Sequence, residues 1–512
     1  MSRFRTPPPG VPAILAAAAF AVWLGAALLP YYGFFIDELY YVACSSRLDW
    51  GYVDHPPLSI LLLRFSREIL GEGRLALRLP AALAGALTVW LTARLARRLG
   101  ARGLGQGIAG GAVLAAPIFG VLFGFYSMNA LEPLVWLASA AILVEIEMRN
   151  EPRLWLLFGA VAGIGLENKH TVVLFAAGLA AGLLLTPARR HLAGRWLWLG
   201  AGIAALLAAP NVLWQVAHGW PSLEFYRNAD LYKNVRTPPL EVLFQQILVT
   251  SPGALPVWIA GLWLLWSRRD GILLRHLAWI YLALLGLMLV GQKSRPDRIA
   301  AIYPLLFAAG GAALDVAARA PRWRWLRWSV PAWLAAWGLL LAPMGLPVLP
   351  PESLAWYMRL VGGAPQMERG EGKRTPIPQY FADRLGWERL VDDVAAAVET
   401  LPAADRRRAV VFAQAYGPAG AVEWLGRKRG LPPAYTGQNS YFLWGPPPDP
   451  VDVAIVLGDD ERRLAELFEE FELAGIHECG SCMPWRNQMP IWIARHPKVP
   501  IAKLWPSVKH YE

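Results

Sequence analysis

The chain has 512 residues, of which 55% are hydrophobic and 17% are charged, and its mean hydropathy is positive. Soluble domains average roughly 25% charged residues, so this composition excludes an ordinary soluble protein and indicates a membrane protein. The formal net charge is +11, but residues from Glu352 onward carry 19 basic and 21 acidic side chains. Because the whole excess therefore lies in the apolar part, we attribute it to basic loops beside anionic lipid and expect no nucleic-acid partner.

A membrane-spanning helix needs about 20 mostly apolar residues, and about eleven segments of the chain approach or reach that length. The sequence therefore predicts a polytopic α-helical membrane protein with about eleven spans, and with up to about thirteen if the shorter segments are divided differently. The predicted spans are 11–30, 79–97, 105–124, 129–147, 153–167, 171–186, 196–214, 252–267, 276–291, 299–317 and 328–347.

The loops between these segments indicate an orientation. If the N-terminus is cytoplasmic, all five predicted inner loops are short and rich in arginine, as the positive-inside rule requires. An odd number of spans then places the C-terminal part and the loop after the first span on the outer face. We expect a multi-pass protein of the inner or plasma membrane. Its first span is expected to be retained, because no small-residue cleavage site follows it.

The first predicted outer loop, residues 31–78, contains two adjacent carboxylates, Asp37 and Glu38, flanked by aromatic residues. From the residues alone three interpretations stay open: solvated loop charge, a metal site or a general base. An ionisable group held among apolar side chains at a membrane is costly and usually functional. Burial would also raise the pKa of a carboxyl towards the range of a useful base. The loop ends in an amphipathic stretch, 58–78, which predicts one helix lying at the membrane interface.

Other polar residues interrupt the apolar pattern at the predicted outer face. His55 precedes two prolines that restrict it to extended conformations, so it is either a structural hydrogen-bonding residue or a phosphate donor. Glu132 begins the fourth span, where a carboxylate either complements the helix dipole or acts chemically. Lys169 and His170 lie in a polar break that is either an ordinary turn or part of a site.

Three cations, Lys293, Arg295 and Arg298, occur in one short outer segment where orientation rules disfavour positive charge. Fixed cations at a lipid interface suit a lipid-linked phosphate, and simple contact with lipid headgroups is the alternative. Tyr303 follows shortly after them.

The composition changes near residue 351, where proline, glycine and charge increase. Alternating strand and helix patterns predict a soluble α/β domain over 351–512 after a membrane domain over 1–350. Cys479 and Cys482 form a CxxC pair without partners at zinc spacing, so outside the membrane we expect a disulfide. The predicted helices are 387–400, 420–429 and 461–472, and the predicted strands are 409–413, 451–457 and 491–495.

Several motifs, taken together, resemble the bacterial branch of the protein O-mannosyltransferase-like glycosyltransferases of family 39, which have the GT-C fold and include the lipid A aminoarabinose transferase. The resemblance covers most of residues 30–310. Its motifs are Ile36-Asp37-Glu38-Leu39-Tyr40-Tyr41, Gly51-Tyr52-Val53-Asp54-His55-Pro56-Pro57-Leu58, Leu77-Arg78-Leu79-Pro80, Asn129-x-x-Glu132-Pro133, Lys169-His170-Thr171, Pro210-Asn211-x-x-Trp214, His218-Gly219-Trp220-Pro221-Ser222 and Tyr303-Pro304.

The resemblance implies transfer of a sugar, with inversion, from a polyprenyl-phosphate carrier to a lipid, glycan or protein acceptor at the outer face of the membrane. It implies that Asp37 is the base, with Glu38 as its acidic neighbour. Glu132 occupies the second acidic position, where relatives often have Asp, and His55 stands where some relatives have Lys. No cofactor is implied, and a divalent metal is left open. The residues expected to bind substrate are Tyr40, Tyr41, His55, Lys169, His170, Lys293, Arg295, Arg298 and Tyr303.

Three other functions are alternatives for this sequence. An oligosaccharyltransferase or O-antigen ligase would use a lipid-diphosphate donor and would require a metal and a larger donor cavity. A transporter would show two related halves with broken helices, which the sequence lacks. A non-catalytic scaffold would leave the acidic pair and the misplaced cations unexplained.

Overall fold

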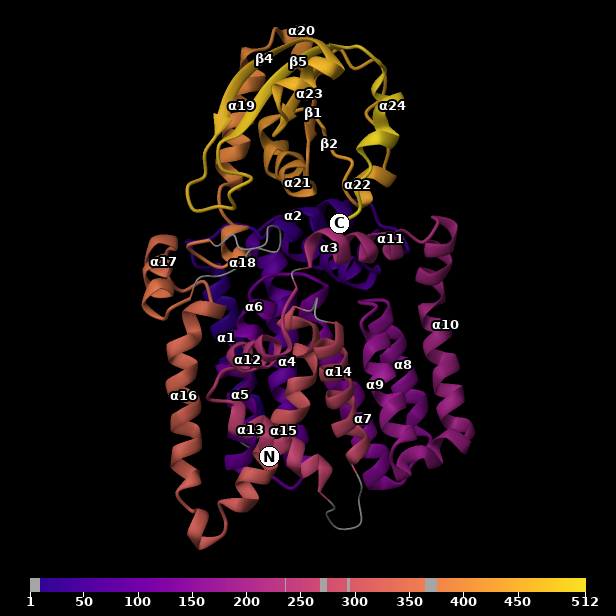
Figure 1. Ribbon diagram of the computed structural model, residues 1–512, viewed down its shortest axis with the longest axis vertical. Helices are drawn as coiled ribbons and strands as arrows, with labels where there is room; N and C mark the ends of the chain where they lie inside the picture. The colour runs from indigo at the N-terminus through magenta and orange to yellow at the C-terminus, as the bar shows by residue number, and fades with distance from the viewer. Residues whose placement is uncertain (1–9, 235, 268–273, 292–294, 364–374) are drawn as a thin grey trace, which may run out of the picture. The chain divides into compact units, whose positions relative to one another are not determined.

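The computed structural model describes residues 10–512 except 235, 268–273, 292–294 and 364–374. Its contacts divide the chain into two compact units, each assembled from segments that are separated in sequence (Figure 1). The first unit comprises Met1–Leu29, Leu75–Leu213 and Val235–Val348. The second comprises Pro30–Arg74, Trp214–Asn234 and Leu349–Glu512, so most of the first predicted outer loop belongs to the same unit as the C-terminal part.

The first unit is helical, and each predicted span contains a helix. The structure thus has the helical architecture that the sequence predicts, with a C-terminal sheet in the other unit. The helices of the first unit are α1 (Val11–Leu28), α4 (Arg74–Arg98), α5 (Gly103–Ala115), α6 (Pro117–Gly124), α7 (Glu132–Arg149), α8 (Leu154–Leu166), α9 (Val172–Leu184), α10 (Arg195–Ala217), α12 (Pro239–Thr250), α13 (Leu255–Trp266), α14 (Arg275–Gly291), α15 (Tyr303–Ala317) and α16 (Leu326–Gly345), with short 3-10 helices η2 (Pro187–Ala193), η4 (Pro296–Ile302) and η5 (Pro321–Trp323).

Length and apolarity alone qualify four helices of the described chain as membrane spans, or up to seven if each bent pair is one span. The predicted span 105–124 is such a pair, because α5 and α6 meet at Pro117 with a bend of 67°. Proline lacks the N–H that would continue the helix. The span count of about eleven stays a prediction.

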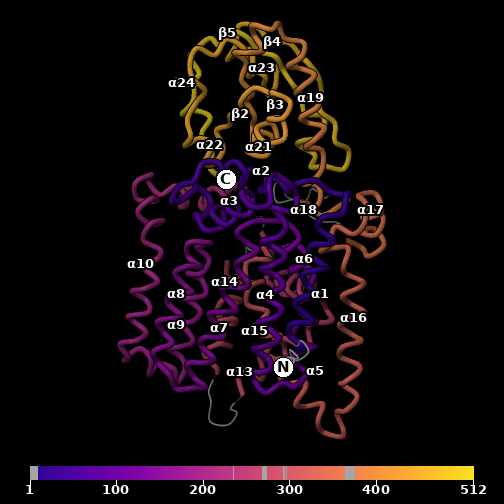
Figure 2. Tube along the Cα trace, turned by 180° about the vertical axis from the view of Figure 1, so that it is seen from behind, coloured from indigo at the N-terminus to yellow at the C-terminus, as the bar shows by residue number. Residues whose placement is uncertain are grey.

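Close helix packing in the first unit depends on glycine. A Cβ on Gly261 of α13 would lie 2.0 Å from the main-chain oxygen of Leu306, and one on Gly310 of α15 would lie 1.8 Å from that of Val257. Only glycine at both positions lets the two helices approach this closely, as is common between helices in membranes. Figure 2 shows α13 beside α15, which is buried along most of its length.

The second unit contains a five-stranded mixed sheet in the order β2-β1-β3-β5-β4. Strands β2, β1 and β3 are parallel, whereas β5 is antiparallel to both β3 and β4. The strands are β1 (Val410–Ala413), β2 (Ala434–Tyr435), β3 (Val453–Leu457), β4 (Phe468–His477) and β5 (Met489–Pro497). The unit's helices include α2 (Ile36–Ser46), α3 (Leu58–Leu70), α11 (Pro221–Asn228), α17 (Pro351–Leu360), α18 (Gln379–Ala382), α19 (Trp387–Thr400), α21 (Tyr416–Leu425), α22 (Ser440–Leu443), α23 (Glu461–Leu467) and α24 (Ile501–Leu504).

Two local predictions in this unit are wrong. The predicted helix 461–472 ends at Leu467, and the chain continues as β4. The predicted interfacial helix 58–78 is interrupted, because α3 ends at Leu70 and Gly71 adopts a φ of 80°, a conformation that glycine adopts without steric cost. The predicted helix 387–400 coincides with α19, and the predicted helix 420–429 begins earlier, at Tyr416.

Candidate functional site

The acidic pair lies in the first turn of α2. The main-chain N–H of Phe35 donates to Glu38 Oε2 over 2.8 Å, so the fully buried Glu38 caps the helix N-terminus. Asp37 is only half-buried. Negative charge at this end of the helix is favoured by the helix dipole, which explains why two adjacent acids are tolerated here.

Asp37 accepts a hydrogen bond from the phenol of Tyr416, with 2.8 Å between the Tyr416 hydroxyl and Asp37 Oδ1. Burial of Tyr416 and the nearby Asp37 carboxylate raise the pKa of this phenol well above its ordinary value. The phenol therefore stays protonated and donates to the carboxylate. The first candidate base is thus held by a neutral donor that lies 379 positions further along the chain.

Two glycines of α21 bring Tyr416 to this position. A Cβ on Gly417 would lie 2.5 Å from Ile36 Cγ1, and one on Gly420 would lie 3.0 Å from the main chain of Leu39. Both contacts fall on α2, so the Gly417-x-x-Gly420 spacing forms a flat face that receives it. Small residues one helical turn apart permit such close approach. The acidic helix and the start of α21 therefore form one packed structure.

A second polar cluster lies one turn further along α2. The Tyr40 hydroxyl is 2.9 Å from Asp54 Oδ1 and 2.7 Å from Ser440 Oγ, and Ser440 Oγ in turn accepts from the N–H of Val53. These bonds join α2, the following loop and α22 within the second unit. Tyr40 is 1% exposed, so its contacts are those of a buried structural residue.

His55 is enclosed by aromatic rings. The centroids of Tyr40, Tyr41 and Tyr52 lie 5.9, 4.5 and 4.9 Å from that of the imidazole, and no part of His55 is exposed. Its Nδ1 lies 3.0 Å from the carbonyl oxygen of Pro56, which can only accept, so Nδ1 carries the proton. Within the described residues Nε2 has no hydrogen-bond partner. Tyr41 of α2 and His55 of the following loop thus belong to one buried aromatic cluster.

The first unit holds a separate charged network. Lys169 Nζ donates to Glu132 Oε2 over 2.6 Å, and the hydroxyl of Thr171 donates to the other oxygen of Glu132. Glu132 is 4% exposed. His170 Nε2 lies 3.0 Å from Asn211 Oδ1. The structure therefore brings Glu132 and Lys169 together as a nearly buried ion pair in which both oxygens of the carboxylate are occupied.

The predicted cation segment begins with Lys293, which lies outside the described residues. Arg295 binds Asp297 through two hydrogen bonds of 3.0 and 2.8 Å. Asp297 and Arg298 lie on η4, which packs against α7, the helix that begins at Glu132. Tyr303 is fully buried and donates to Gln246 Oε1 over 3.0 Å. Arg295 and Arg298 are therefore on a segment next to the Glu132 helix, whereas Tyr303 is a core residue.

Comparison with known proteins identifies relatives of this architecture. The family model of dolichyl-phosphate-mannose-protein mannosyltransferases matches residues 54–214. ArnT from Cupriavidus metallidurans, in structures of the apo state and bound to undecaprenyl phosphate, aligns with TM-scores of 0.60 and 0.58. Each alignment covers 94% of this chain and 97% of the ArnT chain, at 14% and 16% identity. The predicted resemblance to the GT-C glycosyltransferases of family 39 is confirmed.

A second similarity, found by sequence, is to a glycosyltransferase that acts on lipid A. The lipid A galacturonosyltransferase RgtD from Rhizobium johnstonii is 25% identical over 245 residues, which are 46% of this chain and 50% of RgtD. The match thus spans about half the length of that relative. The GT-C fold is that of a multi-pass helical membrane protein, and the alignment with ArnT extends over most of this chain, the C-terminal part included. The family match begins at Asp54, so it includes His55, Glu132, Lys169 and His170 but not the acidic pair.

Three residues of the acidic site were not among the predicted site residues, although Asp54 lies within one of the GT-C motifs. Tyr416, Asp54 and Ser440 contact Asp37 or Tyr40, yet Tyr416 and Ser440 come from the C-terminal part, for which no role was predicted. The sequence does contain one signal for this contact, the Gly417-x-x-Gly420 spacing that follows Tyr416. Two glycines at this spacing near the start of a helix indicate that the helix packs closely against another element. Cys479 and Cys482 form a disulfide beside Gly386, which precedes α19.

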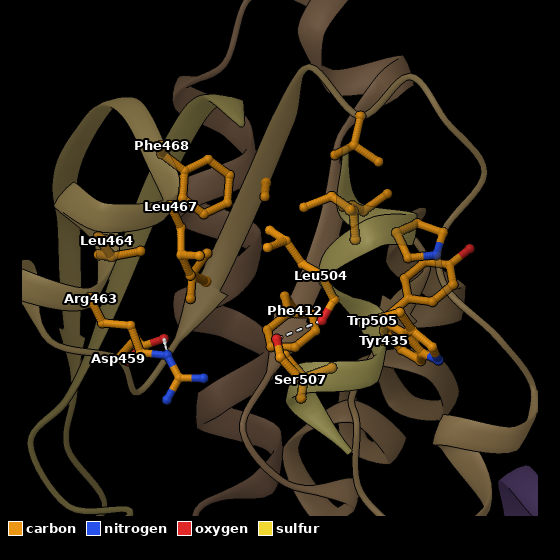
Figure 3. A pocket seen from close by; sticks show the side chains of 17 residues that line it. Phe412, Tyr435, Asp459, Arg463, Leu464, Leu467, Phe468, Leu504, Trp505 and Ser507 are labelled. Carbon is orange, nitrogen blue, oxygen red and sulfur yellow. Dashed lines mark hydrogen bonds and ion pairs between the residues drawn. The ribbon is translucent and has the colours of Figure 1, made fainter. Parts of the chain in front are cut away.

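A cavity in the C-terminal part is a poor candidate for the reaction centre (Figure 3). It lies against β1 and β3 and encloses about 710 Å³, part of it open to solvent. Its lining is almost entirely apolar, and its two charged side chains, Asp459 and Arg463, face each other at 3.6 Å. The cavity contains none of the predicted site residues and belongs to the hydrophobic core around Trp492.

Proposed function

We propose that this protein is an inverting glycosyltransferase that moves a sugar from a polyprenyl-phosphate donor to a lipid, glycan or protein acceptor at the outer face of the membrane. The observation that carries the proposal is the placement of Asp37, a partly accessible carboxylate in the first turn of α2 that accepts from the Tyr416 phenol. The ArnT fold supports it, since one ArnT structure is bound to undecaprenyl phosphate.

The proposed step is a single displacement. An oxygen or nitrogen of the acceptor attacks the anomeric carbon from the face opposite the phosphate, and the bond between this carbon and the phosphate oxygen breaks. The electron pair of that bond leaves with the phosphate, and Asp37 takes the proton of the acceptor. One direct displacement inverts the anomeric centre, by the same logic as in inverting glycosidases.

The departing phosphate needs cations and no general acid, because a phosphate monoester is already a good leaving group. We assign this role to Lys169, Arg295 and Arg298, with Lys293 as a further member. The ion pair with Glu132 orients Lys169, so Glu132 acts as a positioning residue in this proposal. Since Tyr40, Tyr41 and Tyr303 are buried, they shape the site and do not contact substrate.

Tyr416 makes the C-terminal part a component of the catalytic apparatus. Its hydrogen bond fixes the direction of the Asp37 carboxylate, which we propose as the proton acceptor. A charged base held by a neutral donor keeps its negative charge, which a cationic partner would offset. We propose no catalytic metal, and the competing function, transfer from a lipid-diphosphate donor, would require one.

The test uses the purified full-length protein in lipid nanodiscs. It would be incubated with undecaprenyl phosphate carrying galacturonic acid, aminoarabinose or a hexose, with lipid A as acceptor and mass spectrometry of the product. Asp37→Asn should lower transfer about 10²- to 10⁴-fold, the contribution of a general base. Asp49→Asn, an exposed carboxylate of the same loop, is the matched control and should transfer normally.

Three outcomes would contradict the proposal. Full transfer by Asp37→Asn would show that Asp37 is not the general base. Retention of the anomeric configuration would exclude a single displacement. Loss of transfer in EDTA, together with activity on diphosphate-linked donors only, would favour the lipid-diphosphate function.

A further inference from the structure

The first unit contains an arginine-rich cleft whose lining includes none of the residues assigned to the reaction. It is formed by the C-terminal part of α4, the C-terminal part of α7 and the start of α8. The cleft encloses about 1550 Å³, part of it open to solvent. Its lining residues are Leu91, Arg94, Leu95, Arg97, Arg98, Ala141, Ile142, Glu145, Arg149, Leu154 and Leu157.

The charges of the cleft do not balance. Four arginines line it against one carboxylate, Glu145. Arg98 binds Glu145 through two hydrogen bonds of 2.6 and 3.1 Å, and Arg149 binds the same carboxylate over 2.5 Å. Glu145 therefore already has two cationic partners. An excess of positive charge remains at the other arginines.

Arg94 and Arg97 provide that excess. Both are exposed, and within the described parts of the chain neither forms an ion pair or a hydrogen bond with a carboxylate. The guanidinium of Arg94 lies 4.6 Å from the ring centroid of Trp90, which fixes its position by a cation–π contact. Tryptophan is enriched at the level of lipid headgroups, so this pair is placed where a headgroup would be bound.

The rest of the lining is apolar. Leu91 and Leu95 of α4 and Ala141 and Ile142 of α7 line the cleft, and Leu157 of α8 is 51% exposed. An apolar wall contributes nothing to the binding of a free inorganic anion. It does fit an acyl chain, because burying each methylene of the chain is favourable by about 0.8 kcal/mol.

We infer that this cleft is a binding site for an anionic phospholipid, with the phosphate at Arg94 and Arg97 and an acyl chain against the apolar wall between α4 and α7. Arginine binds phosphate oxygens through paired hydrogen bonds. Basic pockets between membrane helices are known to hold acidic lipid headgroups. The ion pair of Arg98 with Glu145 joins α4 to α7 within the lining of the cleft. This inference does not depend on the reaction proposed above.

The experiment measures lipid retention by native mass spectrometry. The full-length protein would be exchanged into detergent with equal amounts of phosphatidylglycerol and phosphatidylcholine. The wild type should retain phosphatidylglycerol preferentially, and Arg94→Gln/Arg97→Gln should lower that preference by about 10-fold or more, as two surface arginines contribute on this scale. Arg322→Gln/Arg324→Gln, two exposed arginines at η5 outside the cleft, is the matched control and should retain it.

Three outcomes would overturn the inference. Equal loss in both double variants would show a diffuse effect of positive charge. Displacement of phosphatidylglycerol by millimolar inorganic phosphate would show a site for the free anion. No preference in the wild type would show no lipid site. Arg94→Lys/Arg97→Lys should keep most of the preference, which separates lost charge from lost folding.

Discussion

The two carboxylates that the sequence singles out for chemistry, Asp37 and Glu132, have opposite surroundings. Asp37 is half-buried and accepts from a neutral phenol, whereas Glu132 is nearly buried and is bound by Lys169 and Thr171. A half-buried carboxylate with a neutral donor keeps its charge and is partly accessible to a proton. One with a cation and a hydroxyl on its two oxygens is neutralised and orients its partner. Similar side chains thus serve different roles through their neighbours.

Breaking the ion pair of Glu132 is expected to have the largest effect. Lys169→Ala leaves a nearly buried carboxylate without its cation, which should lower the free energy of unfolding by about 3–5 kcal/mol. The double variant Lys169→Met/Glu132→Gln should recover most of that stability, because no charge is then left buried. Transfer should stay low in both, since the cation proposed for the phosphate is missing.

The measurement is denaturant unfolding in detergent together with the transfer assay. If Lys169→Ala were as stable as the wild type, Glu132 would not depend on Lys169 for its charge. If the double variant transferred sugar normally, Lys169 would have no role at the phosphate.

The packing of α21 on α2 gives the next largest effect. Gly420→Val places a branched side chain against the main chain of Leu39, where a Cβ alone would be 3.0 Å away. Overpacking of this kind costs about 1–3 kcal/mol, and transfer should fall with it because Tyr416 moves away from Asp37. Gly475→Val, on β4 of the same unit with open space around it, is the control. Equal thermal stability of both variants would show that the contact is not tight.

The sequence predicted a helix or strand correctly where the local pattern of apolar residues matches the face that the fold buries. In α19 the buried residues Trp387, Leu390, Val391, Val394 and Val398 repeat at helical spacing, so both ends were predicted correctly. Strand β4 was missed because its glutamates favour a helix by propensity. It pairs with β5 at the edge of the sheet, where charged residues face solvent.

In the acidic site, too, some residues could be identified from the sequence and others could not. Asp37 was identified because a carboxylate pair among aromatic residues is unusual at any position. Its partner Tyr416 was not, since no local pattern links residues 379 positions apart. His55 and Tyr303 were predicted to bind substrate, and the fold buries both. Burial of such residues depends on which segments pack over them, and the residue types alone do not determine that.

Removing the donor to Asp37 should shift the pH dependence of transfer. Tyr416→Phe deletes a hydrogen bond that stabilises the ionised carboxylate, so the pKa of Asp37 should rise. Because Asp37 must be ionised to accept a proton, the acid limb of the pH–rate profile should move to higher pH. The rate on the alkaline plateau should also fall, because the bond that orients the Asp37 carboxylate is lost.

Tyr441→Phe provides the control for this shift. The Tyr441 hydroxyl donates to Glu423 over 2.8 Å in the same unit, so its loss removes a comparable bond from a carboxylate outside the proposed mechanism. The two other acids near Tyr416, Asp54 and Asp383, are unchanged in both variants. A shift in both profiles, or in neither, would contradict the role of Tyr416.

The smallest effect is expected at Glu38, and it separates the two members of the acidic pair. Glu38→Gln keeps an oxygen that accepts from the N–H of Phe35, so the cap of α2 survives and stability should change by less than about 1 kcal/mol. Transfer should stay close to that of the wild type, because the proposed base is Asp37. Glu38→Ala removes the cap and should lower the free energy of unfolding by about 1 kcal/mol. This loss would show that the stability measurement is sensitive to position 38.

A loss of transfer in Glu38→Gln as large as in Asp37→Asn, with stability unchanged, would mean that the proton is taken by Glu38 or shared by the pair. The Tyr416 bond would then orient a neighbour of the base.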